Sequence, residues 1–208
     1  MTGEAGSPRG EHAWTHIGTV WTNGQPFLAL DASLLPAWRG YSDEHYDLLV
    51  NLGPEVTSVA VGLGTAALIS TDGTVYDEGW LQVYRAEGPS IAVVQAAGRD
   101  YAQALATALA YPADEDEPGD TVEISSGTLV ILDACIDGDG HYSAPIPPES
   151  PGPSPTHWPR FDNELAETGG LRLTAPPGTY RVSVRWLTEV PGTDVCFARW
   201  IIQPDRLR

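Results

Sequence analysis

The chain has 208 residues, of which 42% are apolar, so it can bury one large or two small cores and is not wholly disordered. It carries 28 acidic residues, 11 Arg and no Lys, which gives a formal net charge of −17. This charge repels nucleic acid and anionic membranes and attracts basic proteins, although an acidic surface can also serve solubility alone.

The first half of the chain predicts an α+β unit. Residues 1–12 are polar, lack the apolar centre of a signal peptide and predict a disordered tail, and no later stretch is as long and apolar as a membrane span. We therefore expect a cytoplasmic protein without a membrane partner. Within residues 13–112, apolar runs and alternations predict strands at 26–30, 56–61, 65–69, 80–85 and 91–96.

Two helical segments are predicted in this half. Asp31 can cap a single turn over residues 31–38, which would direct Trp38 inward. Residues 99–111 predict the main α-helix because they are rich in Ala, Asp100 lies near the positive end, and Pro112 prevents continuation. Its apolar face comprises Tyr101, Leu105, Ala108 and Leu109.

The second half predicts a β-rich unit. Residues 113–120 are acidic and predict a solvated linker between the two halves. Residues 144–159 contain seven prolines and predict an extended surface loop, because proline cannot occupy a central strand. Pro176 to Thr179 suits a type II turn within the last sheet. Within residues 121–208, strands are predicted at 128–132, 171–174, 180–186 and 195–202.

These elements predict an α+β fold that is predominantly antiparallel β with one main helix. The two halves either form separate domains or share one core. Gly24 to Ala32 and Gly127 to Ala134 resemble each other, since each is an apolar strand that ends in Asp-Ala. Short apolar strands also resemble one another by chance, so this is a weak indication of a repeat.

No sequence motif for catalysis or metal binding is recognisable. A calcium loop that started at Asp133 or Asp137 would have Ala144 or Pro148 at its twelfth position instead of the required Glu. The five histidines lack zinc-site spacing, and the absence of Lys excludes a Walker A motif. We therefore predict no cofactor, no metal and no enzymatic activity, although acidic side chains could still converge in the fold as in glycosidases.

The two cysteines, Cys135 and Cys196, are predicted to be buried free thiols, with one disulfide as the alternative. Four arginines gather near the C-terminus and either form a cationic patch or pair with carboxylates: Arg172, Arg181, Arg185 and Arg199.

The acidic loop after residue 38 is the best candidate for a binding site. Acids flanked by aromatic residues can bind a basic partner, with the aromatic rings as anchors. We predict partner contacts from Trp38, Asp43, Glu44, Tyr46 and Asp47. The alternative is a solvated loop in which Tyr46 reaches into the core.

The order of segments resembles the bacterial immunity protein 21 family of polymorphic toxin systems. The resemblance covers most of residues 14–187 and rests on packing and turn motifs. Its pieces are Gly24 to Leu30, Ser33 to Gly40, Tyr46-Asp47, the hairpin from Val61 to Ile69, the helix from Asp100 to Leu109, Val130 to Asp133, and Pro177 to Val182. It implies a cytosolic, non-catalytic protein that binds a cognate toxin domain.

Three functions follow as hypotheses. The first is an immunity protein that neutralises a basic toxin, such as a nuclease, through its acidic surface. The second is a β-rich ligand- or carbohydrate-binding module that uses Trp21, Trp80 and Trp158 together with a turn common in sandwich modules. The third is a hydrolase whose carboxylates converge only in the fold.

Overall fold

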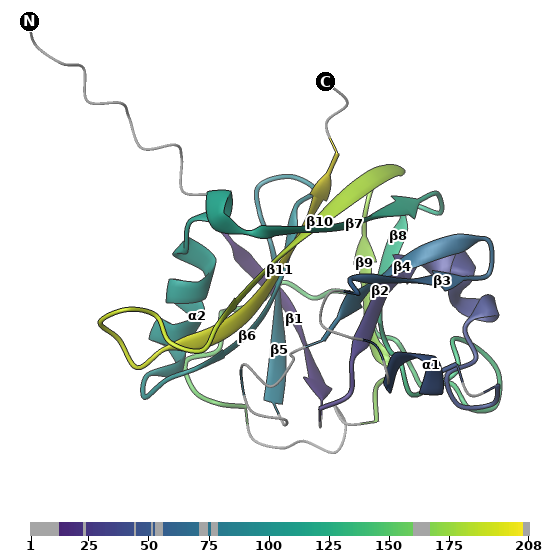
Figure 1. Ribbon diagram of the computed structural model, residues 1–208, viewed down its shortest axis with the longest axis horizontal. Coiled ribbons are helices and arrows are strands. Elements are labelled where there is room, and N and C mark those ends of the chain that lie inside the picture. The colour runs from purple at the N-terminus through teal and green to yellow at the C-terminus, as the bar shows by residue number, and fades with distance from the viewer. Residues whose placement is uncertain are drawn as a thin grey trace, which may run out of the picture.

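A computed structural model describes residues 13–22, 24–43, 45–50, 52, 56–70, 75, 79–159 and 167–205. Within these residues the chain forms two antiparallel β-sheets with one longer α-helix, as predicted for an α+β, β-dominated fold (Figure 1). The strands are β1 (Thr15–Thr22), β2 (Phe27–Asp31), β3 (Ser58–Val61), β4 (Gly64–Ile69), β5 (Gly79–Arg85), β6 (Ile91–Ala97), β7 (Glu117–Ile124), β8 (Thr128–Asp133), β9 (Gly170–Thr174), β10 (Gly178–Leu187) and β11 (Cys196–Pro204). The helices are η1 (Ala32–Ala37), α1 (Asp47–Val50), α2 (Tyr101–Ala110) and η2 (Ala113–Glu115).

The two sheets pack face to face around the main core. Sheet A has the order β1-β5-β6-β11-β10-β7, and sheet B has the order β3-β4-β2-β8-β9. Alternate residues of both sheets point into the space between them, as the period of two in a strand requires, and build a continuous apolar core. Helix α2 covers the outer face of sheet A, and η1 lies on the outer face of sheet B.

Helix α2 confirms the predicted helix and most of its buried face. Asp100 is the N-cap residue, and its carboxylate accepts a hydrogen bond from the backbone N–H of Gln103. The buried residues are Tyr101, Ala104, Leu105 and Ala108, whereas Leu109 is only partly buried. The small alanines allow the helix to approach the sheet closely.

The two halves of the chain share both sheets and one core. Sheet A takes β1, β5 and β6 from the first half and β7, β10 and β11 from the second, and sheet B is likewise composed of strands from both. The acidic segment that predicts a linker, residues 113–120, instead forms η2 and the start of edge strand β7. The acidic composition of this segment predicts exposure to solvent. An edge strand also exposes one edge and one face to solvent, so exposed acids are compatible with a strand.

The strand pairings follow a pseudo-twofold pattern. When β1, β2, β4, β5 and β6 are matched in order with β7, β8, β9, β10 and β11, every pairing in one half has its counterpart in the other, and only β3 is extra. The two halves meet where β2 pairs with β8 and where β6 pairs with β11, both antiparallel.

Sequence and register support this correspondence. Thr19-Val20 in β1 matches Thr121-Val122 in β7, and Leu30-Asp31-Ala32 matches Leu132-Asp133-Ala134 with the same spacing along the chain. The first strand of each half also contains one extra residue relative to its partner strand, in β1 against β5 and in β7 against β10. The weak repeat in the sequence therefore coincides with a repeat in the topology.

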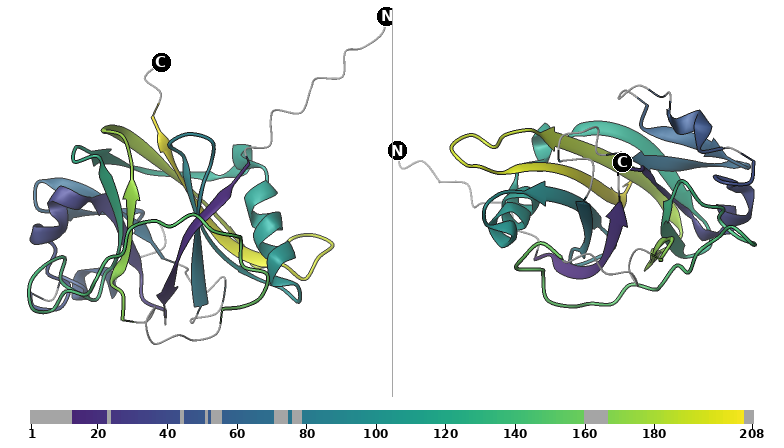
Figure 2. Two further views of the ribbon diagram at one scale, coloured as in Figure 1. Left: turned by 180° about the vertical axis from the view of Figure 1, so that it is seen from behind. Right: turned by 90° about the horizontal axis from the view of Figure 1, so that it is seen from below.

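The proline-rich loop, residues 144–159, lies across one open side of the sandwich. The N–H groups of Ser150 and Gly152 donate to Ile17 and His16 of β1, and the N–H of Glu149 donates to Arg172 of β9. The loop thus joins the edge strands of both sheets, and Figure 2 shows it crossing between them. Glu149 adds an ion pair with Arg85 at 2.7 Å. This arrangement covers one edge of each sheet, β1 of sheet A and β9 of sheet B.

The segment around Pro176 differs from the prediction. Strand β9 belongs to sheet B and β10 to sheet A, so residues 175–177 carry the chain between the sheets instead of closing a hairpin within one. The hydroxyl of Tyr180 donates to the carbonyl of Pro176, four residues earlier, which fixes this crossing as in the tyrosine corners of other sandwiches.

Candidate protein-binding surface

The loop after η1 is anchored on the second half of the chain. The buried carboxylate of Asp137 accepts hydrogen bonds from the backbone N–H groups of Tyr41 and Ser42, both at 3.0 Å. Burial alone would raise the pKa of Asp137, but these hydrogen bonds and the nearby Arg39 guanidinium hold it below its usual value. The Arg39 guanidinium also contacts Asp139 at 2.6 Å.

Close contacts with neighbouring backbone also restrict this loop. A Cβ atom at Gly40 would lie 2.2 Å from the carbonyl oxygen of Ala134, and one at Gly138 would lie 2.0 Å from that of Leu35. Only glycine fits at these two positions, so the loop and the turn at residues 137–140 are held in one arrangement.

An aromatic pair lies on the outer side of this anchored loop. Tyr41 is 62% exposed and Tyr142 is 48% exposed, and their ring centroids are 4.6 Å apart. Leu48 is 65% exposed and follows within the same compact turn of chain. We call the surface formed by Tyr41, Asp43, Asp47, Leu48 and Tyr142 the tyrosine platform.

The structure separates the residues that were predicted to contact a partner. Asp43 and Asp47 are exposed, and Glu44 lies outside the described residues. Trp38 is only 2% exposed, contacts His45 and donates its indole N–H to the carbonyl of Ala134, so its ring cannot serve as a surface anchor in this conformation. Sheet B offers an apolar outer face, and Trp38 helps to cover it.

Tyr46 is half-buried. Burial and the neighbouring Cys135 raise the pKa of Tyr46 to about 12, and burial together with Asp133 raises the pKa of Cys135 to about 12. Cys135 is therefore a poor nucleophile at neutral pH. Both cysteines are free and half-buried, and not paired in a disulfide.

Sequence reasoning missed Tyr41, Leu48 and Tyr142. Tyr41 and Leu48 belong to the same polar stretch as the acidic residues. An aromatic or apolar residue in a polar stretch was the sequence feature that could have identified them as exposed contact residues. Tyr142 could not be connected with them from the sequence, because it is about 100 residues away and meets Tyr41 only through the anchoring by Asp137.

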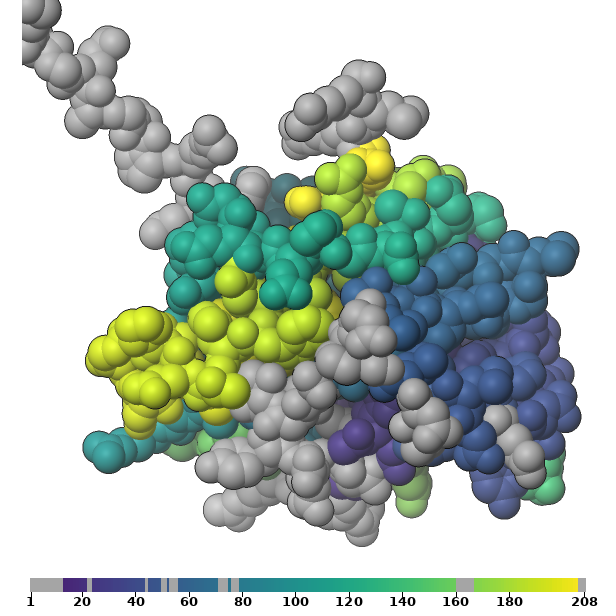
Figure 3. Space-filling model, in the orientation of Figure 1, coloured from purple at the N-terminus to yellow at the C-terminus, as the bar shows by residue number. Residues whose placement is uncertain are grey.

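A second acidic surface lies along the edge strand β7. Exposed carboxylates occur at Asp114, Glu115, Glu117, Asp120 and Glu123. Asp120 accepts hydrogen bonds from Thr57 and Ser58, which join β7 to the start of β3. Figure 3 shows this teal segment lying against the blue hairpin of β3 and β4. Charged side chains on an edge strand also discourage edge-to-edge aggregation, which suffices to explain them.

The arginines of the last strands lie mostly in ion pairs. Arg181 pairs with Asp205, while Arg185 and Arg199 both contact Asp116. Among the tryptophans proposed for carbohydrate binding, Trp80 is buried, Trp21 is partly buried, and Trp158 is 40% exposed and stacks on Tyr101. These three side chains do not form one exposed aromatic surface.

Within the part of the chain that the structure describes, no group of three or more His, Cys, Asp or Glu side chains is arranged to hold a metal ion. No helix in the same residues is long and apolar enough to cross a membrane. Among the described carboxyl groups, burial raises the pKa of Asp133. This carboxyl accepts a hydrogen bond from the backbone N–H of Cys135.

No protein-family model, no curated protein and no solved structure matches this chain. The resemblance to the immunity protein 21 family stays a prediction.

Proposed function

We propose that this chain is an immunity protein of the bacterial cytoplasm, which binds and neutralises a cognate toxin domain through the tyrosine platform. The observation that supports the proposal is the exposed Tyr41–Tyr142 pair, whose two backbones are both hydrogen-bonded to Asp137 and which is flanked by exposed acids on a protein of net charge −17. Tyrosine is enriched in the energetic centres of protein interfaces, and a preformed loop loses little entropy on binding.

The acidic charge favours a basic toxin, for which a nuclease is the leading candidate. Opposite charge accelerates encounter, and fast encounter matters for an inhibitor that must capture a toxin before it acts. Asp43 and Asp47 are exposed beside the tyrosines, so they can contribute to steering without the cost of desolvating a buried charge.

The proposal is tested by capture and then by variants. The tagged chain is used to isolate partners from its own cell lysate at low and moderate salt, with identification by mass spectrometry. We expect one stoichiometric basic protein with a toxin-like C-terminal domain, captured less efficiently as salt rises. Capture of no partner from cells that express such a toxin would contradict the proposal.

Variants of the platform then locate the interface on the purified pair. Tyr41→Ala with Tyr142→Ala is expected to weaken binding at least about 30-fold, as loss of a central aromatic anchor does. Asp43→Arg with Asp47→Arg is expected to slow association and to reduce its salt dependence.

A matched control changes the net charge equally elsewhere. Glu87→Arg with Glu189→Arg alters two exposed acids in hairpin turns of sheet A, away from the platform on sheet B. If this control slowed association as much as the platform variant, the acidic surface as a whole and not the platform would steer the partner.

A further inference from the structure

The second open side of the sandwich contains a cavity. The proline-rich loop crosses the side between β1 and β9, whereas no such loop crosses the pseudo-equivalent side between β7 and β4 in the described part of the chain, and a pocket of about 110 Å³ lies there. The lining is mainly apolar and consists of Pro26, Leu49, Leu52, Val56, Thr57, Leu68, Ser70, Gly119, Val182, Val184, Trp186 and Trp200. Cavities of roughly 150 Å³ bind a molecule such as benzene, and this pocket is smaller but partly open to solvent, so it accommodates no more than about one ring.

The equivalent side of the first half also has a pocket beside the proline-rich loop, but its lining includes the charged residues Arg85, Glu87 and Glu149, so the mainly apolar lining is particular to the second half. Gly18 and Gly119 lie beside the register shifts in the first strands of their halves. A Cβ at Gly18 would lie 2.6 Å from the Leu171 side chain, so that position is filled. Gly119 forms part of the pocket wall, where a Cβ would lie 3.2 Å from the carbonyl oxygen of Val182 and 3.6 Å from the Cβ of Thr57.

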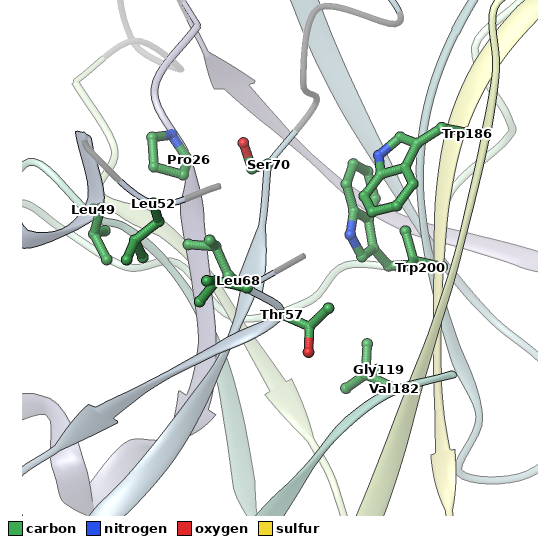
Figure 4. Close-up of a pocket in the computed structure, with 12 residues that line it drawn as sticks. Pro26, Leu49, Leu52, Thr57, Leu68, Ser70, Gly119, Val182, Trp186 and Trp200 are labelled. Carbon is green, nitrogen blue, oxygen red and sulfur yellow. The ribbon is translucent and has the colours of Figure 1, made fainter. Parts of the chain in front are cut away.

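The wall formed by sheet A carries hydrogen-bond donors. Figure 4 shows the indole rings of Trp186 and Trp200 on one side of the pocket, opposite Pro26, Leu49 and Leu52, with the nitrogen-bearing edge of Trp200 turned toward the pocket. The N–H of Trp186 is buried and has no acceptor among the described residues. An indole N–H can only donate, and buried donors are normally paired.

We propose that this pocket binds a small, largely apolar molecule of about one aromatic ring that carries a hydrogen-bond acceptor, such as a carbonyl oxygen. The apolar lining would take up the ring, and the acceptor would pair with the indole N–H groups of the wall. This site is distinct from the tyrosine platform and goes beyond the proposed function, so either can fail without the other.

Two nearly isosteric probes test the proposal, namely acetophenone, which has a carbonyl acceptor, and α-methylstyrene, which has none. Binding is followed in the full chain by the ¹H–¹⁵N resonances of the tryptophan indoles. We expect acetophenone to shift the signals of Trp186 and Trp200 and to bind about three- to tenfold more tightly than α-methylstyrene. Absence of saturable binding, or equal affinities for the two probes, would overturn the proposal.

Variants separate the site from its donors. Val184→Phe fills the pocket and is expected to abolish binding of both probes, while Trp186→Phe with Trp200→Phe keeps binding but loses the preference for acetophenone. A preference that survived in the double variant would overturn the assignment of the donors. If a variant does not fold, as judged by its remaining indole signals, the comparison of the two probes on the unmodified chain still tests whether the pocket binds a ring with an acceptor.

Discussion

Two aspartates at equivalent positions in the two halves, the buried Asp31 and the partly buried Asp133, have pKa values shifted in opposite directions. Asp31 receives hydrogen bonds from the N–H groups of Ser33, Ser125 and Ser126. Burial would raise the pKa of Asp31, but these bonds outweigh it and lower the pKa from 3.8 to about 2. Among the described residues, Asp133 accepts a hydrogen bond from one backbone N–H, that of Cys135, and burial raises its pKa. The number of backbone donors decides the direction.

Asp31 should therefore stabilise the fold in its ionised form. Its folded pKa is depressed, so the stabilisation is complete above the unfolded value of 3.8 and is lost as pH falls from 3.8 toward 2. We expect Asp31→Asn to lower the free energy of unfolding by about 2 kcal/mol at pH 7, and the deficit to shrink below pH 4. Urea unfolding of both proteins across pH 2–7 measures it.

Asp133→Asn is the control for Asp31→Asn. The folded pKa of Asp133 is raised, so ionisation costs stability above the unfolded pKa, and the variant should lose less or gain at pH 7. If both variants showed the same dependence on pH, the contrast between these two environments would be refuted.

Two buried glutamines provide a second matched pair. Gln82 and Gln95 are both 0% exposed. Gln82 bonds with Thr19, His16 and the hydroxyl of Tyr101, while neither amide atom of Gln95 has a partner in the described part of the chain. A buried amide without partners costs free energy that a similarly shaped apolar side chain avoids.

We expect Gln95→Met to raise the free energy of unfolding by about 1 kcal/mol or more, and Gln82→Met to lower it by about 1–3 kcal/mol. Chemical denaturation of the two variants at pH 7 measures both changes. Destabilisation by Gln95→Met would mean that the amide is satisfied in solution.

At the scale of elements, one arginine of β11, Arg199, forms hydrogen bonds with the C-terminal end of helix α2. The Arg199 guanidinium is 1% exposed and donates to the carbonyls of Ala108 and Tyr111 at 2.7 Å and to the carboxylate of Asp116 at 2.6 Å. The last carbonyls of a helix have no partners within the helix, so Arg199 supplies them from the sheet. It thereby connects α2, sheet A and the start of the second half.

Arg199→Met is expected to destabilise the protein by about 3–5 kcal/mol, because it leaves Asp116 buried with only the longer contact to Arg185. Arg199→Lys should rescue little, since an ammonium cannot reach several acceptors in the planar geometry of a guanidinium. Arg199→Met combined with Asp116→Leu should cost less than Arg199→Met alone. Thermal unfolding followed by circular dichroism compares the three, and full rescue by Lys would contradict this role.

At the scale of the whole molecule, the halves depend on each other. Strands β2 and β6 of the first half pair with β8 and β11 of the second, and the core between the sheets takes residues from both. Each half alone would expose this core and two unpaired strand edges. The pseudo-twofold arrangement thus resembles a dimer joined into one chain, with its interface as the core.

We expect the fragments 1–112 and 113–208 to be unfolded separately and to form the native sandwich when mixed or co-expressed. The intact chain should unfold in one cooperative transition by calorimetry. A folded isolated fragment, or two separate transitions in the intact chain, would show that the halves are independent domains.

The sequence by itself determined the elements whose signals are local. The cap at Asp100, the alanines of α2 and Pro112 act within a few residues of the helix, and the alternation of apolar residues identified most strands and the β-rich class. The same reasoning failed for residues 117–120, because an acidic edge strand has little apolar pattern, and for residues 176–179, because a turn sequence does not reveal that the chain changes sheet.

Only the tertiary structure decided which distant segments meet. It joined the two halves into one core, buried Trp38 against Ala134, brought Tyr142 to Tyr41, and placed Trp186 and Trp200 on the wall of one pocket. These contacts arise from the pairing of strands up to about 100 residues apart, and a local pattern carries no information on such pairing. The acidic loop was predictable from its composition, whereas the rings exposed beside it depended on burial, which only the packed sheets define.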